Sequence, residues 1–388
     1  MVMSTISLLH VFIIPARIDL TYSQNVRHHN ITRTNEIWNL HQNQRAGIDA
    51  VQVSDIRAGD PGTCPDGTID QSYNCTKHGL ICTESIPADL IVPEIDNCTA
   101  TTCLISDPKP GRRVASVVPQ FKHTSVFHTI YLPPNFTSTR RWPLIVEFSG
   151  NDIEPQDGNW TCNGFGISQG RDYIWLSLPF LSAEDGNRTC NQRVWWGCDP
   201  SACDSYVPQS QPICQNESLT PSRYDPEPTV RYTLLAVRQV IKQFNVDPKR
   251  VLLTGHSRGA IAVNYIGLYN DTIASLWSAF APTSHYDGVQ SWDFNKYRGQ
   301  DLKAYRLDAL KRLRRIGDRP VWIAAECDLA TSVTRDYLEG TGVSLSNFVF
   351  RGTGFKDHNS FWSLRADPGH VRRDLREWVK STMGTTAL

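Results

Sequence analysis

The spacing of apolar positions along the chain changes at about residue 114. Residues 24–113 are rich in Asn, Thr, Asp, Pro and Cys and show little periodicity, so we expect an irregular segment held by disulfides. Beyond it, short apolar runs bounded by turn residues alternate with stretches of helical spacing. The runs that predict strands are 125–133, 143–150, 172–180, 250–255, 276–282, 320–326 and 347–350.

Between these runs the spacing predicts helices over 229–244, 258–269, 301–317 and 369–381. Apolar strands that alternate with helices are typical of an α/β domain, with a mostly parallel sheet covered on both faces. Residues 114–388 are expected to form this domain. Residues 181–228, with four Cys and the doublet Trp195–Trp196, interrupt the alternation. We interpret them as an insertion over the carboxyl edge of the sheet, a candidate lid or substrate-binding cap.

The first residues contain one apolar run, 6–14, which has the length of a signal-peptide core and is too short to span a bilayer. We expect a signal peptide over 1–23, with a disordered tail as the alternative because no Lys or Arg precedes the run. No other segment predicts a membrane span. Lys and Arg (39) balance Asp and Glu (39), so the net charge favours neither nucleic acid nor an anionic membrane as a partner.

Ten of the eleven cysteines fall into two clusters, and Cys327 stands apart in a predicted strand. Neither cluster contains the C-x-x-C pairs with histidines that zinc sites favour, so we expect disulfides, an oxidising compartment and no metal. The odd count leaves one thiol, which we assign to Cys327 as a small buried residue. The clustered cysteines are Cys64, Cys75, Cys82, Cys98, Cys103, Cys162, Cys190, Cys198, Cys203 and Cys214.

Eight N-x-[ST] sequons also indicate secretion, because roughly three are expected by chance from the 20 Asn of the chain. We therefore expect a secreted, extracellular glycoprotein. The sequons begin at Asn30, Asn74, Asn97, Asn135, Asn159, Asn187, Asn216 and Asn270.

A candidate nucleophile, Ser257, lies in the stretch LLTGHSRGA (252–260), which has the pattern G-x-S-x-G. It follows a predicted strand and precedes a predicted helix, the setting in which a sharp turn exposes a serine hydroxyl. Gly255 and Gly259 are expected there because side chains would collide in such a turn. The alternative is a serine with no role beyond the turn.

A serine nucleophile needs a base and an orienting acid, which in this arrangement follow it in the order Ser, acid, His. Asp328, just after the predicted strand 320–326, is the expected acid; Glu326 is an alternative, and Asp328 also suits a helix N-cap. His358, after the strand 347–350, is the expected base.

Three other histidines compete with His358. We expect His256 to point away from the serine, His285 to line the substrate pocket, and His370 to lie on the surface at the start of a helix.

The oxyanion of an acyl-transfer reaction needs backbone N–H donors. We expect them from Arg258 and from the loop at Gly150 and Asn151. The Arg258 side chain is expected to meet an acidic group of the substrate, a leaving group, or an acidic residue of a covering loop. Five tryptophans are candidates for an aromatic surface that binds a sugar or phenolic ester, with simple packing as the alternative: Trp160, Trp195, Trp196, Trp292 and Trp362.

Two stretches resemble the serine α/β-hydrolases, in the esterase branch near feruloyl esterases, polyhydroxybutyrate depolymerases and esterase D. They are YLPPNFTSTRRWPLIVEFSGN (131–151) and NVDPKRVLLTGHSRGA (245–260), and the resemblance covers about 115–385. It implies an α/β-hydrolase fold without cofactor, with Ser257, Asp328 and His358 as the catalytic residues.

The resemblance predicts hydrolysis of a carboxylic ester through an acyl-enzyme, on a small-molecule or carbohydrate-linked substrate. Two other functions stay open: a serine peptidase of the prolyl oligopeptidase type, and a binding ectodomain that retains the fold without catalysis.

Overall fold

The computed structural model describes residues 88–98, 103–150, 161–181, 191–192, 226–291, 301–355, 358, 360–366 and 370–384. The chain divides into two units, Met1–Ala50 and Val51–Leu388, and every described residue belongs to the second. The expected signal peptide lies outside the described residues, as do most of 24–113 and most of the insertion 181–228. The domain boundaries therefore stay predictions.

A nine-stranded sheet forms the centre of the described chain, in the order β1-β2-β3-β5-β4-β8-β9-β10-β11. Neighbouring strands are parallel except where β3 pairs with β2 and with β5. The strands are β1 (Ile95–Asp96), β2 (Arg113–Ser116), β3 (His128–Tyr131), β4 (Trp142–Phe148), β5 (Ile174–Leu178), β8 (Val246–His256), β9 (Ala279–Thr283), β10 (Val321–Ala325) and β11 (Phe348–Gly352). A separate antiparallel pair joins β6 (Phe180–Leu181) and β7 (Asn191–Gln192).

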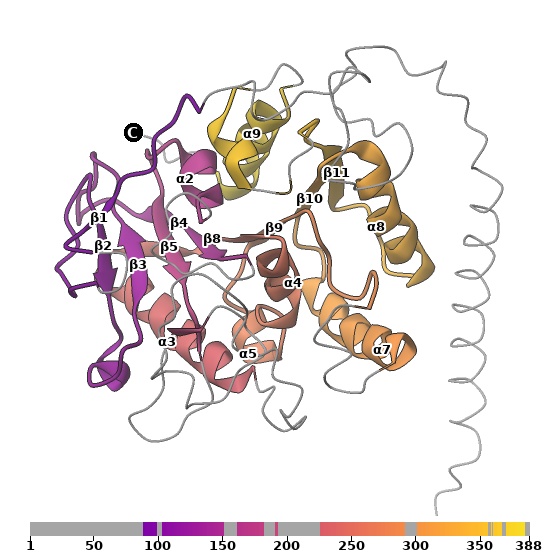
Figure 1. Cartoon of the computed structure of the whole chain (residues 1–388), viewed down its shortest axis with the longest axis horizontal. Coiled ribbons are helices and arrows are strands. Elements are labelled where there is room, and N and C mark those ends of the chain that lie inside the picture. The colour runs from indigo at the N-terminus through magenta and orange to yellow at the C-terminus, as the bar shows by residue number, and fades with distance from the viewer. Residues whose placement is uncertain are drawn as a thin grey trace, which may run out of the picture. The chain divides into compact units, whose positions relative to one another are not determined.

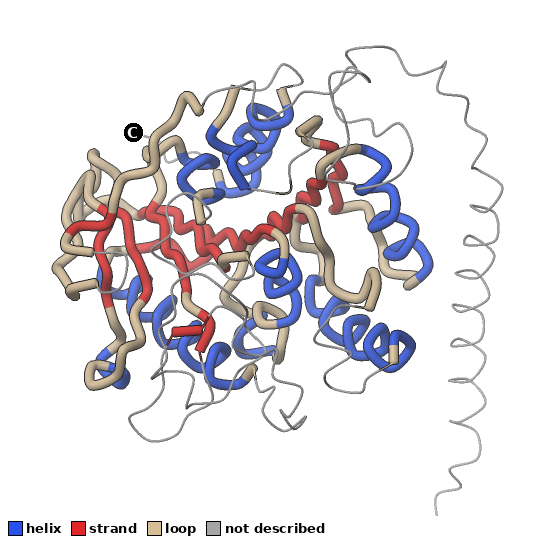
Figure 2. The backbone as a smooth tube through the Cα atoms, viewed as in Figure 1, coloured by secondary structure: helices blue, strands red, loops and turns tan. Residues whose placement is uncertain are grey.

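Helices cover both faces of this sheet, as Figures 1 and 2 show. One face carries α2 (Asn163–Ser168) and α9 (Val371–Met383), and the opposite face carries the next four helices along the chain. These are α3 (Glu227–Gln243), α4 (Arg258–Tyr265), α5 (Asp271–Ala274) and α7 (Leu302–Leu313). The remaining α-helix, α8 (Asp328–Gly340), packs against β10 and β11. Three short 3₁₀ segments span Pro119–Phe121, Arg314–Ile316 and Ser360–Leu364.

This strand order, with its one antiparallel strand and helices on both faces, is the α/β-hydrolase fold. Each of the seven predicted strands and four predicted helices overlaps an element of the structure, so the predicted fold class is confirmed. The apolar runs were sufficient to predict the strands because parallel strands covered by helices are buried on both faces. All seven residues of β4, for example, are buried.

The core between the sheet and the α2–α9 layer is rich in aromatic side chains. Trp322 of β10, Phe165 of α2 and Leu375 of α9 belong to it, and Trp362 packs among them with 3% of its surface exposed. Trp362 is therefore a core residue and not part of an aromatic binding surface. The other four candidate tryptophans, including Trp195 and Trp196, lie outside the described residues.

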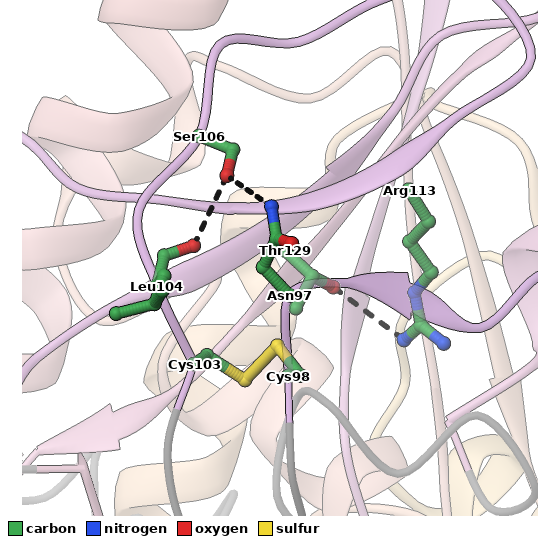
Figure 3. Close-up of a disulfide and its surroundings, with 7 residues drawn as sticks. All are labelled: Asn97, Cys98, Cys103, Leu104, Ser106, Arg113 and Thr129. Carbon is green, nitrogen blue, oxygen red and sulfur yellow. Dashed lines mark hydrogen bonds between the residues drawn. A yellow bond between two sulfur atoms is a disulfide. The ribbon is translucent and has the colours of Figure 1, made fainter.

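The described cysteines confirm the expectation of disulfides and correct one assignment. Cys98 and Cys103 are joined, close to a hydrogen bond from Asn97 Nδ2 to Ser106 Oγ (Figure 3). Cys327, the expected free thiol, is disulfide-bonded. The free thiol in the described part of the chain is instead Cys162, which is fully buried. Burial suits a thiol and a disulfide equally well, so it could not distinguish the two cysteines.

Three of the eight sequon asparagines lie in the described part of the chain. Asn97 and Asn135 are exposed. The Asn270 side chain accepts hydrogen bonds from the backbone N–H groups of Thr272 and Ile273, which caps the first turn of α5.

Candidate active site

Ser257 lies between β8 and α4 in a backbone conformation that few residues adopt. Its φ is 57° and its ψ is −123°. The Ser257 N–H donates to the Thr283 carbonyl at 3.0 Å, which ties the turn to the end of β9. Strain of this kind is stable only where the surroundings impose it, and it concentrates at functional sites.

The two glycines of the motif are required by close approaches of the backbone. A Cβ on Gly255 would lie 2.4 Å from the Gly259 carbonyl oxygen. A Cβ on Gly259 would lie 2.3 Å from the Phe148 carbonyl oxygen at the end of β4. The first turn of α4 is thus packed directly against the neighbouring strand.

His358 connects Ser257 to a carboxylate. Its Nε2 is 2.8 Å from Ser257 Oγ, and its Nδ1 is 2.8 Å from Glu326 Oε1. The segment that carries His358 is held to the end of β10, because Thr353 N–H donates to the Ala325 carbonyl. A hydroxyl, an imidazole and a carboxylate hydrogen-bonded in this order form the arrangement that activates a serine for nucleophilic attack.

The carboxylate in contact with His358 is Glu326, so the assignment of the acid position to Asp328 is wrong. Asp328 is the first residue of α8, its side chain is exposed, and its Oδ1 accepts a hydrogen bond from the Gly352 N–H at 2.9 Å. Nor is it a helix N-cap, since Cys327 occupies that position. Glu326 directly follows β10 and is buried, with 6% exposed. The start of α8 turns Asp328 away from the base.

Two further imidazole rings lie beside His358. The ring centroids of His256 and His285 are each 4.8 Å from that of His358. Burial lowers the pKa of both His256 and His285 well below the usual value, and the nearby His358 lowers each further. Both rings are therefore neutral near pH 7.

This arrangement bears on the expectations for the histidines and corrects one of them. His285 lies at the site as expected, and its contact with substrate stays a prediction. His256 does not point away, because its ring packs beside the ring of His358. His370 is exposed at the N-cap of α9.

The two backbone segments from which we expect the oxyanion donors lie next to each other. Arg258 begins α4, and Gly150 is buried two residues beyond β4. A Cβ on Gly259 would collide with the Phe148 and Ser149 carbonyls, so these two segments pack closely together. Asn151 lies outside the described residues. The Arg258 guanidinium is close enough to lower the pKa of His285.

Glu147 of β4 is a buried carboxylate next to this region that the sequence did not single out. Glu147 of β4 accepts hydrogen bonds from the Asn163 N–H, the Gly164 N–H and the Trp175 indole, at 3.0, 2.9 and 2.8 Å. Burial raises its pKa to about 7, against the lowering effect of those donors and of Arg113. The signal in the sequence that could have identified Glu147 is that it is the one Glu inside the apolar run PLIVEFSG.

Within the described ranges, no three His, Cys, Asp or Glu side chains gather in a way that could hold a metal ion. The described helices are all too short or too polar to cross a membrane.

No family model and no curated protein matches the chain. Among solved structures, a thermostable esterase is similar at 14% identity over 69% of this chain and 62% of that chain, with a TM-score of 0.41. The S-formylglutathione hydrolase of Agrobacterium tumefaciens is 14% identical over 73% of this chain and 100% of its own, with a TM-score of 0.46. A ferulic acid esterase is 12% identical over 70% and 97%, with a TM-score of 0.44. At these identities function rests on the chain's own residues.

Proposed function

We propose that this chain is a secreted serine hydrolase that cleaves a carboxylic ester through an acyl-enzyme intermediate. The observation that carries the proposal is the hydrogen-bonded series Ser257–His358–Glu326, with the serine in a strained turn. The substrate class is a small-molecule or carbohydrate-linked ester.

In the first half of the reaction, Ser257 Oγ attacks the ester carbonyl while His358 Nε2 takes its proton. Glu326 accepts the hydrogen bond from the other ring nitrogen, which orients the imidazole and stabilises its protonated form. The N–H groups of Arg258 and of the Gly150–Asn151 loop are the proposed donors to the oxyanion. His358 then gives its proton to the alcohol, and the C–O bond breaks to leave an acyl-serine.

In the second half, His358 removes a proton from water, whose oxygen attacks the acyl carbon. Collapse of this intermediate breaks the bond to Ser257 Oγ, which regains a proton from His358, and the carboxylic acid leaves. The reaction needs no cofactor.

Secretion is part of the proposal. It is supported by the disulfide-bonded Cys98, Cys103 and Cys327, since disulfides persist in oxidising compartments, and by the eight sequons. A shift to lower mass on glycosidase treatment of protein from the medium of a eukaryotic host tests it. Protein that stays in the cell without glycans would contradict it.

Labelling of the protein with a fluorophosphonate probe, beside turnover of a short-chain nitrophenyl ester, tests the chemistry. We expect labelling of the wild type, loss of labelling in Ser257→Ala, and loss of ester turnover in both Ser257→Ala and His358→Ala by at least about 10³-fold. Circular dichroism confirms that each variant is folded.

The same preparations distinguish the other functions. A matched peptide amide turned over faster than the ester would indicate a peptidase. A folded wild-type protein that takes up no probe and turns over neither substrate would be a binding ectodomain, and the proposed function would be wrong.

A further inference from the structure

His256 lies against the proposed base and takes part in no step of the reaction. Its side chain is buried, with 3% exposed, and its ring centroid is 4.8 Å from that of His358 at an interplanar angle of 44°. The G-x-S-x-G turn requires glycines on either side but not a histidine before the serine. A buried polar ring at this position therefore needs another reason.

Two hydroxyl groups at the end of β9 hold the His256 ring. Its Nδ1 lies 3.2 Å from Ser284 Oγ and 3.4 Å from Thr283 Oγ1. The Thr283 hydroxyl in turn donates to the Gly255 carbonyl at 3.1 Å, and the Thr283 carbonyl accepts the Ser257 N–H. The same strand end thus fixes both the nucleophile and this ring.

Ser284 is the second strained residue of the site. Its φ is 76°, in the left-handed region, and its N–H donates to the Ala324 carbonyl of β10 at 2.7 Å. Such a conformation persists in a residue other than glycine only where neighbouring groups impose it. Here it places a hydroxyl within hydrogen-bond distance of His256. Two strained serines at adjacent strand ends therefore both meet imidazole rings.

The charge state of His256 fits a supporting role. Burial and the neighbouring His358 lower its pKa well below the usual value, so it stays neutral while His358 gains and loses its proton. Among the described residues, the other ionisable groups around His358 are Glu326 from the end of β10, His285 from the end of β9 and, beside His285, Arg258 of α4. Of these, Glu326 is the hydrogen-bonded partner.

We propose that His256, held by Ser284, is a positioning residue that fixes the imidazole of His358 at the angle needed to reach Ser257 Oγ. The His256 ring packs beside the base, and the Ser284 hydroxyl, together with that of Thr283, limits its rotation. The inference rests on the proposed function, since it concerns the base of the same reaction. His256, the histidine of the GHSRG stretch, thus has a role separate from the formation of the strained turn.

His256→Asn tests the proposal, because asparagine retains a polar group near Ser284 and removes the ring. We expect kcat for the nitrophenyl ester to fall about tenfold, because small displacements of a catalytic group are costly, while KM changes less than about twofold. The rate of fluorophosphonate labelling falls by the same factor as kcat. Ser284→Ala, which retains the ring but removes the shorter of its two hydroxyl contacts, lowers kcat about threefold, again with KM unchanged.

His128→Asn is the matched control. His128 is another buried neutral histidine, 1% exposed, with Nδ1 2.8 Å from the Tyr232 hydroxyl and a pKa lowered by burial to about 3. We expect this variant to lose stability in thermal unfolding and to retain the kcat of the wild type. All assays are run at a temperature where each variant is folded.

Three results separate the possibilities. Wild-type protein without labelling would overturn the proposed function itself. Labelled wild type with an unchanged kcat in folded His256→Asn would overturn the positioning role alone. An equal loss of kcat in His128→Asn would show that the effect follows from general destabilisation, and would overturn it too.

Discussion

At the scale of single residues, the choice of acid separates two carboxylates that are two positions apart. Glu326 reaches His358 Nδ1, and Asp328 instead accepts the Gly352 N–H. In an extended strand such residues would share a face, so alternation cannot distinguish them. The backbone turns into α8 between them, and only this turn decides which side chain faces the base. The longer Glu side chain also spans the distance from the strand end.

Substitution of each carboxylate checks this assignment. We expect Glu326→Gln to lower kcat by at least about 100-fold, because the amide no longer stabilises the protonated base or selects its tautomer. Asp328→Ala removes one partly buried hydrogen bond, and we expect about 1 kcal/mol less stability with kcat within about threefold of the wild type. Ester kinetics beside urea unfolding measure both. The opposite ranking of kcat would return the acid position to Asp328.

At the scale of elements, α2 is a helix whose first turn is capped from a strand. Cys162, its N-cap, makes no side-chain cap hydrogen bond, and Glu147 of β4 accepts the first N–H groups instead. Asn163 then extends its Nδ2 to the Thr283 hydroxyl beside Ser257, at 3.4 Å. A helix of six residues has little stability by itself, so we infer that the carboxylate holds it in place.

The raised pKa of Glu147 predicts a pH-dependent stability. Its ordinary value is 4.5 and its value in the fold is about 7, so between these the folded protein binds a proton that the unfolded chain releases. Relative to Glu147→Gln, the wild type is therefore most stable below about pH 4.5 and loses that advantage as pH rises through about 7. The change is about 1.4 kcal/mol for each pH unit between the two pKa values.

Urea unfolding of both proteins at pH 5, 6, 7 and 8 measures this difference. A stability difference that does not vary with pH would show that the Glu147 pKa is not raised. Glu227, an exposed residue in the first turn of α3, offers Glu227→Gln as a control substitution of an exposed carboxyl group.

At the scale of the whole molecule, the fold decides which cysteines form disulfides and which remain free thiols. Their positions in the chain do not decide it. Cys162 lies buried beneath the site, where its Sγ donates to Ser360 Oγ at 3.2 Å. Burial and the nearby Glu147 carboxylate raise its pKa to about 12. A thiol of this kind is protonated at neutral pH and poorly reactive.

Alkylation followed by peptide mass spectrometry tests this distribution. In the native protein at pH 8 we expect no modification of Cys162 by iodoacetamide within the time that modifies a small-molecule thiol completely. In denaturant without reductant, Cys162 is modified, while Cys98, Cys103 and Cys327 are modified only after reduction. Modification of Cys327 without reductant would restore it as the free thiol.

Much of the fold was predictable because a local signal specified it. The strands were found from apolar runs, since parallel strands covered by helices are buried on both faces, and the helices from their spacing. The helix α2 was missed because six residues with two glycines carry no such spacing. The antiparallel direction of β3 has no signal in its own residues either.

The sequence by itself determined the α/β class, the strained turn at Ser257 and the position of His358, because each depends on residues close together in the chain or on their order along it. Tertiary structure alone decided that Glu326 and not Asp328 meets the base, that His256 packs beside it, and that Glu147 caps α2. Each of these three contacts joins residues that lie far apart in the chain. Their distances follow from how the carboxyl ends of β4, β8, β9 and β10 align at one edge of the sheet.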